Sequence, residues 1–305
     1  AGEALLVASS RPGLGELART LADSRFVIWL GYGARGAAEE IRALAARSRA
    51  PVMSSPRGKG IFPETSRQYL GVTGLGGDDV VEHLRAYDPA YTLVLGSRLG
   101  EFTSFWDPAL LPSKAIVHVD VNDAVFGAAY PQVVTHGIRC EVGDFVQELL
   151  RVWPHDARIT RRPPRPTAEP FEPSGIISRR ESGAQRISRP ILGKVRPSVL
   201  MEAIQRGVVE GTDAIVMTEA GNAFAWGSAS LRFEEPRYRV STGWGSMGQA
   251  AAAVIGAALG SGRKAVAILG DGAMLMQSEV STAVQYGIPA VWIVLNDGRY
   301  GMIEG

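Results

Sequence analysis

Two short motifs in the second half of the chain carry residues suited to binding a metal ion and a phosphate. GDGA (residues 270–273) follows one continuous apolar run, and NDG (residues 296–298) follows the next. Asp271 and Asn296 are 25 positions apart, which is enough for one helix and the strand that returns from it. The two side chains can therefore converge at neighbouring strand ends, where a carboxylate and an amide oxygen suit Mg²⁺. Gly272 lets the backbone approach a phosphate, and the start of the following helix offers free N–H groups to it.

Strands and helices must position these motifs. The sequence predicts them as apolar runs that alternate with segments of helical spacing. This rhythm predicts an α/β fold with two doubly wound, parallel-sheet, Rossmann-like domains. A continuous apolar run such as residues 26–30 is typical of a strand buried on both faces. The other predicted strands are residues 51–53, 91–96, 115–121, 214–218, 238–242, 265–269 and 290–295, and the predicted helices are 37–47, 78–88, 143–153, 197–209, 249–260 and 275–286.

A break in composition separates the two predicted domains. Residues 154–190 contain 7 of the 18 prolines and 8 arginines without a sustained period, which is typical of a long Pro/Arg-rich linker. The prediction is a Rossmann-like domain at 1–153, the linker at 154–190, and a second α/β domain at 191–305. A length of 305 residues is consistent with two domains.

Charge and composition exclude several classes of function. Lys and Arg number 32 against 31 Asp and Glu, so no overall positive field favours nucleic acid or a membrane surface. The longest apolar run, residues 250–260, is too short to span a bilayer. No basic segment opens the sequence as in a signal peptide, which predicts a cytoplasmic protein. The single cysteine, Cys140, excludes an internal disulfide framework.

The first half contains a second motif, which offers an alternative function. Gly31, Gly33 and Gly36 match the G-x-G-x-x-G fingerprint of dinucleotide-binding proteins and lie between a predicted strand and a predicted helix. This alternative is an NAD(P)-dependent oxidoreductase. However, the next strand ends in SSP (residues 54–56), which provides no acid for a ribose hydroxyl. We therefore favour a tight turn that packs helix against strand.

The loops of the second half occur in a recognisable order. Residues 270–301 read GDGAMLMQSEVSTAVQYGIPAVWIVLNDGRYG, residues 241–260 read STGWGSMGQAAAAVIGAALG, and residues 219–226 read EAGNAFAW. Together they resemble the thiamine-diphosphate-dependent enzymes of the acetolactate synthase and 2-oxo acid decarboxylase family. The first half, with GKG at residues 58–60, is similar to the central domain of that family. The resemblance extends over about residues 15–305. It implies that residues 1–153 are a central domain and that residues 191–305 are a truncated domain that binds thiamine diphosphate and Mg²⁺.

The resemblance implies a role for each matching residue. Asp271, Asn296 and the Gly298 carbonyl would hold Mg²⁺. The carbonyl of Gly245 would accept a hydrogen bond from the aminopyrimidine of the cofactor, and Met247 would be the apolar wedge beneath it. The remaining implied cofactor-binding residues are Gly221, Asn222, Ala223, Gly270, Gly272 and Ala273 around the diphosphate, Ser246 beside Met247, and Tyr300, Gly301 and Met302 near the thiazolium.

The resemblance further implies thiamine-diphosphate- and Mg²⁺-dependent decarboxylation of a 2-oxo acid, followed by carboligation. A simple decarboxylase and a non-catalytic subunit remain alternatives. Family members activate the cofactor with a glutamate from a preceding domain, and no glutamate here lies in a matching motif. We therefore expect a homodimer or homotetramer with interfacial sites, and an inactive isolated chain. The loop SRLGEFTSFWD (residues 97–107) lacks the pattern of flavin-binding synthases, which argues against FAD.

A few isolated residues are weaker candidates. Glu219 follows a predicted strand and can be either a site acid or a cap. Phe224 and Trp226 can line a pocket or pack their helix, and Cys140 is interpreted as a small buried side chain. The four histidines lack metal-ligand spacing; they are His83, His118, His136 and His155.

Overall fold

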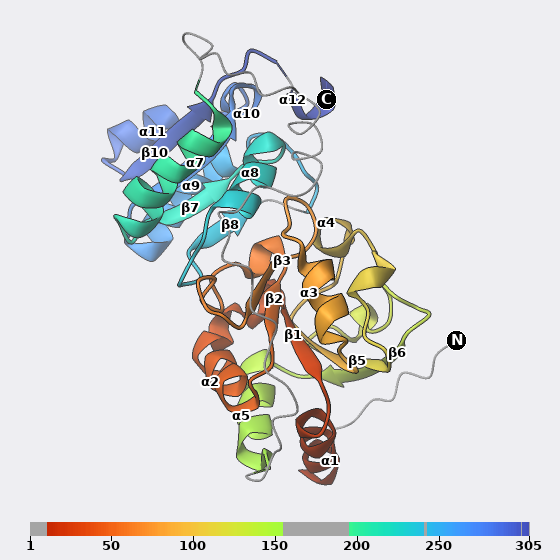
Figure 1. Cartoon of the computed structure of the whole chain (residues 1–305). Coiled ribbons are helices and arrows are strands. Elements are labelled where there is room, and N and C mark those ends of the chain that lie inside the picture. The colour runs from red at the N-terminus through yellow and green to blue at the C-terminus, as the bar shows by residue number, and fades with distance from the viewer. Residues whose placement is uncertain (1–10, 155–194, 241–242, 300, 305) are drawn as a thin grey trace. The chain divides into compact units, whose positions relative to one another are not determined.

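A computed structural model of the chain describes residues 11–154, 195–240, 243–299 and 301–304 (Figure 1). These residues form two compact units. Unit 1 holds the described residues of the first half except Leu75–Gly77, together with Glu234–Pro236, and unit 2 holds the remainder. The predicted linker, residues 154–190, lies outside the described residues except for Pro154.

Unit 1 is built on a six-stranded parallel sheet with the strand order β3-β2-β1-β4-β5-β6. From β1 the chain adds strands on one side, then returns to add β4, β5 and β6 on the other side. This is the predicted doubly wound arrangement, and the reversal lies between β1 and β4. The strands are β1 (Phe26–Leu30), β2 (Val52–Ser54), β3 (Tyr69–Val72), β4 (Tyr91–Leu95), β5 (Ala115–Asp120) and β6 (Val134–Arg139).

Helices cover both faces of this sheet, which explains why β1 is apolar throughout. Phe26, Ile28 and Leu30 belong to a core shared with α1, α2 and α5, whereas Val27 and Trp29 belong to a core shared with α3. Figure 1 shows α2 and α5 close together beside the sheet. The helices are α1 (Arg11–Ala22), α2 (Ala38–Ser48), α3 (Val80–Tyr87), α4 (Glu101–Ser104) and α5 (Val142–Val152).

A buried ion pair closes the loop after β2. Lys59 Nζ lies 2.8 Å from Glu64 Oε2, and both side chains are fully buried. Glu64 Oε1 also accepts a hydrogen bond from the Gly60 N–H at 2.9 Å. Because an unpaired buried charge is costly, each partner holds the other in place. The lysine of the GKG motif therefore stabilises the loop of unit 1.

Unit 2 contains a second, smaller parallel sheet with the strand order β10-β9-β7-β8. Its strands are β7 (Ile215–Thr218), β8 (Tyr238–Val240), β9 (Ala265–Gly270) and β10 (Ala290–Leu295). Its helices are α7 (Pro197–Ile204), which continues as a π-helical segment at Gln205–Glu210, α8 (Asn222–Ser230), α9 (Gln249–Ser261), α10 (Asp271–Met274), α11 (Val280–Gln285) and α12 (Gly301–Glu304). Two parallel sheets with helices on their faces confirm the predicted fold class.

The Ala-rich segment predicted as a helix forms α9 and packs on the sheet of its own unit. Ala251, Val254 and Ala258 are buried in a core with Ala267 and Leu269 of β9. The opposite face of the sheet is covered by α7 and α8, which share a second core with β7, β8 and β9. None of the helices in the described ranges is both long enough and apolar enough to cross a membrane.

One predicted helix is shorter than expected at its start. The pattern predicts a single helix over 275–286, whereas α10 ends at Met274 and α11 begins only at Val280. The Gln277 side-chain carbonyl accepts a hydrogen bond from the Val280 N–H at 3.2 Å, which caps the start of α11. Such side chain-to-backbone bonds compete with a continuous helix. The helical spacing of apolar residues does not reveal this competition.

Two of the three glycines of the fingerprint motif, Gly31 and Gly33, lie in close backbone contact with the loop after β4. The N–H groups of Gly31 and Gly33 donate to Leu95 O and Gly96 O, each at 2.9 Å. A Cβ atom added at Gly31 would lie 2.3 Å from Gly96 O and 2.4 Å from Ser97 Cβ, whereas one added at Gly36 would meet nothing within 4 Å. The loop after β1 thus lies directly on the loop after β4, so these glycines serve packing of backbone on backbone.

This packing predicts that two alanine substitutions in the same motif change the free energy of unfolding by different amounts. Gly31→Ala should destabilise the protein by about 1–3 kcal/mol, because the new methyl group overpacks a rigid backbone contact. Gly36→Ala should change stability by less than about 0.5 kcal/mol, since the space there is open. Urea unfolding of the two variants and the unsubstituted protein measures both values. Equal effects of the two substitutions would contradict the packing role.

Candidate functional site

The candidate site lies at the carboxyl edge of the sheet in unit 2. In the parallel register, Thr218 of β7 pairs with both Ile268 of β9 and Val240 of β8, and Leu295 of β10 pairs with Gly270 of β9. The loops after all four strands therefore leave the sheet at one edge. The order of strands reverses between β7 and β9, and ligands of doubly wound sheets bind at such a reversal.

Asp271 and Asn296 follow directly on the paired ends of β9 and β10. Asp271 is the first residue of α10 and is half-buried, while Asn296 is exposed. Among the described residues, none donates a hydrogen bond to the Asp271 carboxylate, so its oxygens remain available. Asn296 Oδ1 accepts from the Gly298 N–H at 3.2 Å, which fixes the loop after β10. One carboxylate and one amide oxygen at adjacent strand ends fit the few protein ligands that Mg²⁺ takes.

The described residues contain no group of three or more His, Cys, Asp or Glu side chains that could hold a metal ion by themselves. This finding is compatible with the proposed ligand set, because that set needs only one carboxylate. Its other protein ligands are an amide oxygen and a backbone carbonyl. The remaining coordination positions of Mg²⁺ are typically filled by phosphate and water.

Backbone N–H groups at the same edge suit the diphosphate. The first turn of a helix has N–H groups without partners inside the helix. In the described part of the chain, those of Asn222 and Ala223 in α8 have no acceptor, and the same holds for Gly272 and Ala273 in α10. Gly221, which precedes α8, has φ 95° and ψ −151°, a conformation that a side chain would strain. These groups fit an anionic ligand.

The start of α9 differs, because a side chain already satisfies it. Glu219 Oε2 accepts hydrogen bonds from the N–H groups of Ala250 and Ala251 at 2.9 and 3.2 Å, and Oε1 accepts from the Ala220 N–H at 3.1 Å. Glu219 is fully buried. Of the two interpretations from the sequence, the cap describes this geometry. Sequence spacing could not identify the partner, which lies 31 positions away.

The loop after β7 and the loop after β10 approach each other near α12. A Cβ atom at Gly301 would lie 2.6 Å from Asp297 Oδ2 and 3.1 Å from Asn222 Nδ2, and one at Gly221 would lie 3.8 Å from Met302 Cβ. The loop after β7 and the loop after β10 are therefore adjacent. Tyr300, which the resemblance places near the thiazolium, lies outside the described residues.

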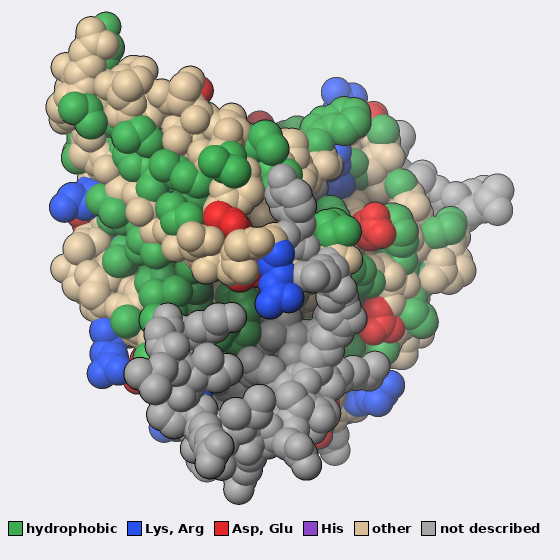
Figure 2. Space-filling model, turned by 90° about the horizontal axis from the view of Figure 1, so that it is seen from above, with side chains coloured by type: hydrophobic (Ala, Val, Ile, Leu, Met, Phe, Trp, Pro, Cys, Tyr) green, Lys and Arg blue, Asp and Glu red, His purple; other side chains and the backbone are tan. Residues whose placement is uncertain are grey.

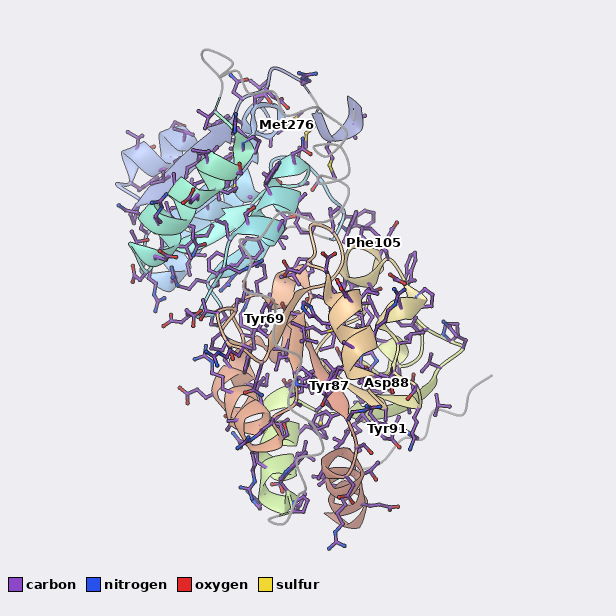
Figure 3. The ribbon with its side chains drawn as sticks, viewed as in Figure 1. Tyr69, Tyr87, Asp88, Tyr91, Phe105 and Met276 are labelled. Carbon is purple, nitrogen blue, oxygen red and sulfur yellow. The ribbon has the colours of Figure 1, made fainter. Side chains whose placement is uncertain are left out.

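The GSMG loop, residues 245–248, lies against the segment that follows α10. Gly248 is the N-cap of α9 with φ 94°, and a Cβ atom there would lie 3.0 Å from Met276 Cβ. Figure 3 shows Met276 beside α10. Met247 is 42% exposed. Figure 2 shows hydrophobic side chains in many places on this face, with Lys, Arg, Asp and Glu side chains among them. The wedge role of Met247 stays a prediction.

Phe224 and Trp226 belong to the core of unit 2. Both are buried, and both lie in the cluster that α7 and α8 form with β7 and β8. Of the two interpretations from the sequence, packing of the helix therefore describes them.

Two family models match the chain. The thiamine pyrophosphate enzyme central domain matches residues 16–149, and the thiamine pyrophosphate enzyme C-terminal TPP-binding domain matches residues 219–305. The chain belongs to the thiamine pyrophosphate enzyme family. Thiamine pyrophosphate is another name for thiamine diphosphate, so the matches agree with the resemblance found in the sequence.

Several proteins with similar sequences carry the names of enzymes. A Mycobacterium tuberculosis protein described as an acetolactate synthase large subunit is 31% identical over 90% of this chain and 48% of its own length. The Haemophilus influenzae acetolactate synthase large subunit is 26% identical over 91% of this chain and 48% of its own length. Sulfoacetaldehyde acetyltransferase of Castellaniella defragrans is 28% identical over 93% of this chain and 50% of its own length. The chain thus spans about half the length of these relatives.

The described histidines belong to no group of three or more His, Cys, Asp or Glu side chains that could hold a metal ion. His118 is buried, and its Nε2 lies 2.7 Å from Ser97 O. Burial lowers the pKa of His118, which keeps the ring neutral at physiological pH. His155 lies outside the described residues.

Cys140 is a free, half-buried cysteine packed against the core of unit 1. Burial, together with the nearby carboxylates of Asp144 and Glu141, raises the pKa of the Cys140 thiol to about 11. The thiolate is the reactive form of cysteine. Cys140 therefore stays almost entirely in its less reactive thiol form at neutral pH, and it serves packing against the core of unit 1.

The raised pKa predicts how fast Cys140 is alkylated. At pH 8 iodoacetamide should modify folded protein about 100-fold more slowly than urea-unfolded protein, whose thiol titrates near pH 8.5. The rate in folded protein should rise with pH up to about pH 11, because deprotonation is delayed to that range. Mass spectrometry after timed quenching measures the rate. Equal rates in folded and unfolded protein at pH 8 would contradict the shift.

Proposed function

We propose that this protein uses thiamine diphosphate and Mg²⁺ to decarboxylate a small-molecule 2-oxo acid and to join the product to a second carbonyl compound. The observation that carries the proposal is the placement of Asp271 and Asn296 after the paired ends of β9 and β10. Bound thiamine diphosphate supplies a nucleophilic carbon and an electron sink for this chemistry.

In this proposal Asp271, Asn296 and the Gly298 carbonyl hold the metal ion, which neutralises the diphosphate. The N–H groups at the starts of α8 and α10 bind the diphosphate oxygens. The residues assigned to this end of the cofactor are Gly221, Asn222, Ala223, Gly270, Gly272 and Ala273. Support comes from the backbone N–H groups of Asn222, Ala223, Gly272 and Ala273, which have no acceptor among the described residues, and from the match of residues 219–305 to a TPP-binding domain.

The other end of the cofactor is assigned to the GSMG loop. The Gly245 carbonyl accepts a hydrogen bond from the aminopyrimidine, with Ser246 beside it and Met247 as the apolar support beneath the cofactor. Tyr300, Gly301 and Met302 shape the surroundings of the reacting carbon. An acid from a neighbouring subunit completes the site in this proposal, so the working protein is a homodimer or homotetramer.

Carboligation is favoured over simple decarboxylation because similar proteins are named acetolactate synthases. Similarity to sulfoacetaldehyde acetyltransferase makes acetyl transfer the second candidate. Product analysis with a panel of 2-oxo acids separates the candidates. An acyloin product supports carboligation, an acetylated acceptor supports acetyl transfer, and a free aldehyde supports simple decarboxylation.

The metal assignment predicts a graded loss of cofactor affinity. Asp271→Ala should weaken binding of thiamine diphosphate with Mg²⁺ more than about tenfold, or 1.4 kcal/mol, because it removes the only carboxylate of the set. Asn296→Ala should weaken binding less, since water can replace a neutral ligand. Isothermal titration calorimetry on the assembled protein measures both affinities.

Asp213→Asn is the control for Asp271→Ala, because it also removes one negative charge from unit 2 but away from the proposed site. Asp213 is exposed and precedes β7, so it lies at the opposite edge of the same sheet. This variant should bind the cofactor with unchanged affinity. Unchanged affinity in folded Asp271→Ala would refute the metal assignment, and absence of binding in the unsubstituted protein would refute the proposed function.

A further inference from the structure

Glu219 forms hydrogen bonds with three separate parts of unit 2: strand β9, the loop after β7 and the start of helix α9. Its backbone N–H donates to Ile268 O of β9 at 2.9 Å, while its carboxylate accepts from Ala220 in its own loop and from Ala250 and Ala251 at the start of α9. The side chain is fully buried. The connection therefore joins β9, the loop after β7 and the helix that follows the GSMG loop.

The charge of Glu219 is balanced by backbone groups. Among the described residues no Lys, Arg or His forms an ion pair with it, and both carboxylate oxygens accept N–H donors. A carboxylate at the positive end of a helix is favourable, and hydrogen bonds to a charged acceptor are strong. A buried acceptor of this kind can change position only if all its donors move with it.

The same helix turn is also tied to β10. The indole N–H of Trp292 donates to Ala251 O at 2.8 Å. The peptide groups at Ala251 are thus held from both sides, with the N–H bound to Glu219 and the carbonyl bound to Trp292. Because α9 begins directly after Gly248, these bonds fix where the GSMG loop ends.

We propose that Glu219 is a positioning residue that fixes the spacing between the loop for the diphosphate and the GSMG loop for the aminopyrimidine. This inference rests on the proposed function, because only a ligand that spans both loops senses their spacing. It also accounts for the choice of anion site. The N–H groups of Ala250 and Ala251 are occupied by Glu219, whereas those of Asn222 and Ala223 remain available to the diphosphate.

The test compares a ligand that spans both loops with one that reaches a single loop. Glu219→Gln keeps the size of the side chain but directs an NH₂ group at backbone donors. Affinities for thiamine diphosphate and for inorganic pyrophosphate, each with Mg²⁺, are measured by calorimetry on the assembled protein. We expect thiamine diphosphate to bind at least about tenfold more weakly and pyrophosphate to bind within about twofold of the unsubstituted protein.

Two further variants keep the test interpretable. Glu219→Asp retains the charge but shortens the reach, so its affinity for thiamine diphosphate should be intermediate, and it serves if Glu219→Gln does not fold. Glu202→Gln removes an exposed carboxylate from α7 and should leave both affinities unchanged. Hydrogen exchange of the Ala250 and Ala251 amides should accelerate in Glu219→Gln, while exchange at Ile255 in the same helix should not.

Each other outcome overturns the inference. Unchanged affinity for thiamine diphosphate in a folded Glu219 variant would show that spacing does not depend on this residue. Equal weakening of both ligands would show a general structural role. If the unsubstituted protein binds pyrophosphate but not thiamine diphosphate, the proposed function itself fails, and the inference fails with it for a distinguishable reason.

Discussion

The parallel pairing of β9 with β10 is the constraint on which the candidate site depends. Leu295 lies opposite Gly270, so Asp271 and Asn296 leave the sheet at adjacent positions. A shift of one residue would turn every side chain of β10 to the other face of the sheet. Ile293 packs in the core shared with α7 and α8, whereas Trp292 packs in the core shared with α9. Packing of partly buried side chains on both faces thus favours this register, which places Asp271 and Asn296 directly after paired strand ends.

The two units share one architecture but use its reversal point differently. In unit 1 the loops after β1 and β4 are in direct backbone contact, because Gly31 and Gly33 donate to Leu95 and Gly96. The backbone N–H and carbonyl groups at this reversal therefore form hydrogen bonds with each other. In unit 2 the reversal lies between β7 and β9, and the N–H groups at the starts of α8 and α10 remain unpaired among the described residues. Similar topology therefore yields a packed junction in unit 1 and a polar, receptive edge in unit 2.

Much of the fold could be predicted because most of its strands are continuous apolar runs, and several of these are buried on both faces. The run at residues 26–30 is apolar throughout and forms β1, while the strands that escaped prediction have weaker patterns. β3 contains Gly71 with φ 131°, and β6 contains His136 and Gly137 among its apolar residues. The late start of α11 at Val280, whose N–H donates to Gln277 Oε1, is not revealed by the spacing of apolar residues.

The candidate site was predictable only in part. Spacing predicted that Asp271 and Asn296 lie close together, because a strand-helix-strand unit has a characteristic length. The bonds of Glu219 to α9 and the approach of Gly301 to Asn222 depend on tertiary structure, since these partners are far apart in sequence. Ligand roles of the individual residues stay predictions, because neither fold nor family match determines them.

Direct location of the metal ion tests the central claim. Crystals of the protein grown with thiamine diphosphate and Mn²⁺ in place of Mg²⁺ would give an anomalous signal at the bound metal. The account predicts a peak within coordinating distance of the Asp271 carboxylate and Asn296 Oδ1, beside the diphosphate. A peak on other residues, or bound cofactor without any peak between these two side chains, would contradict it.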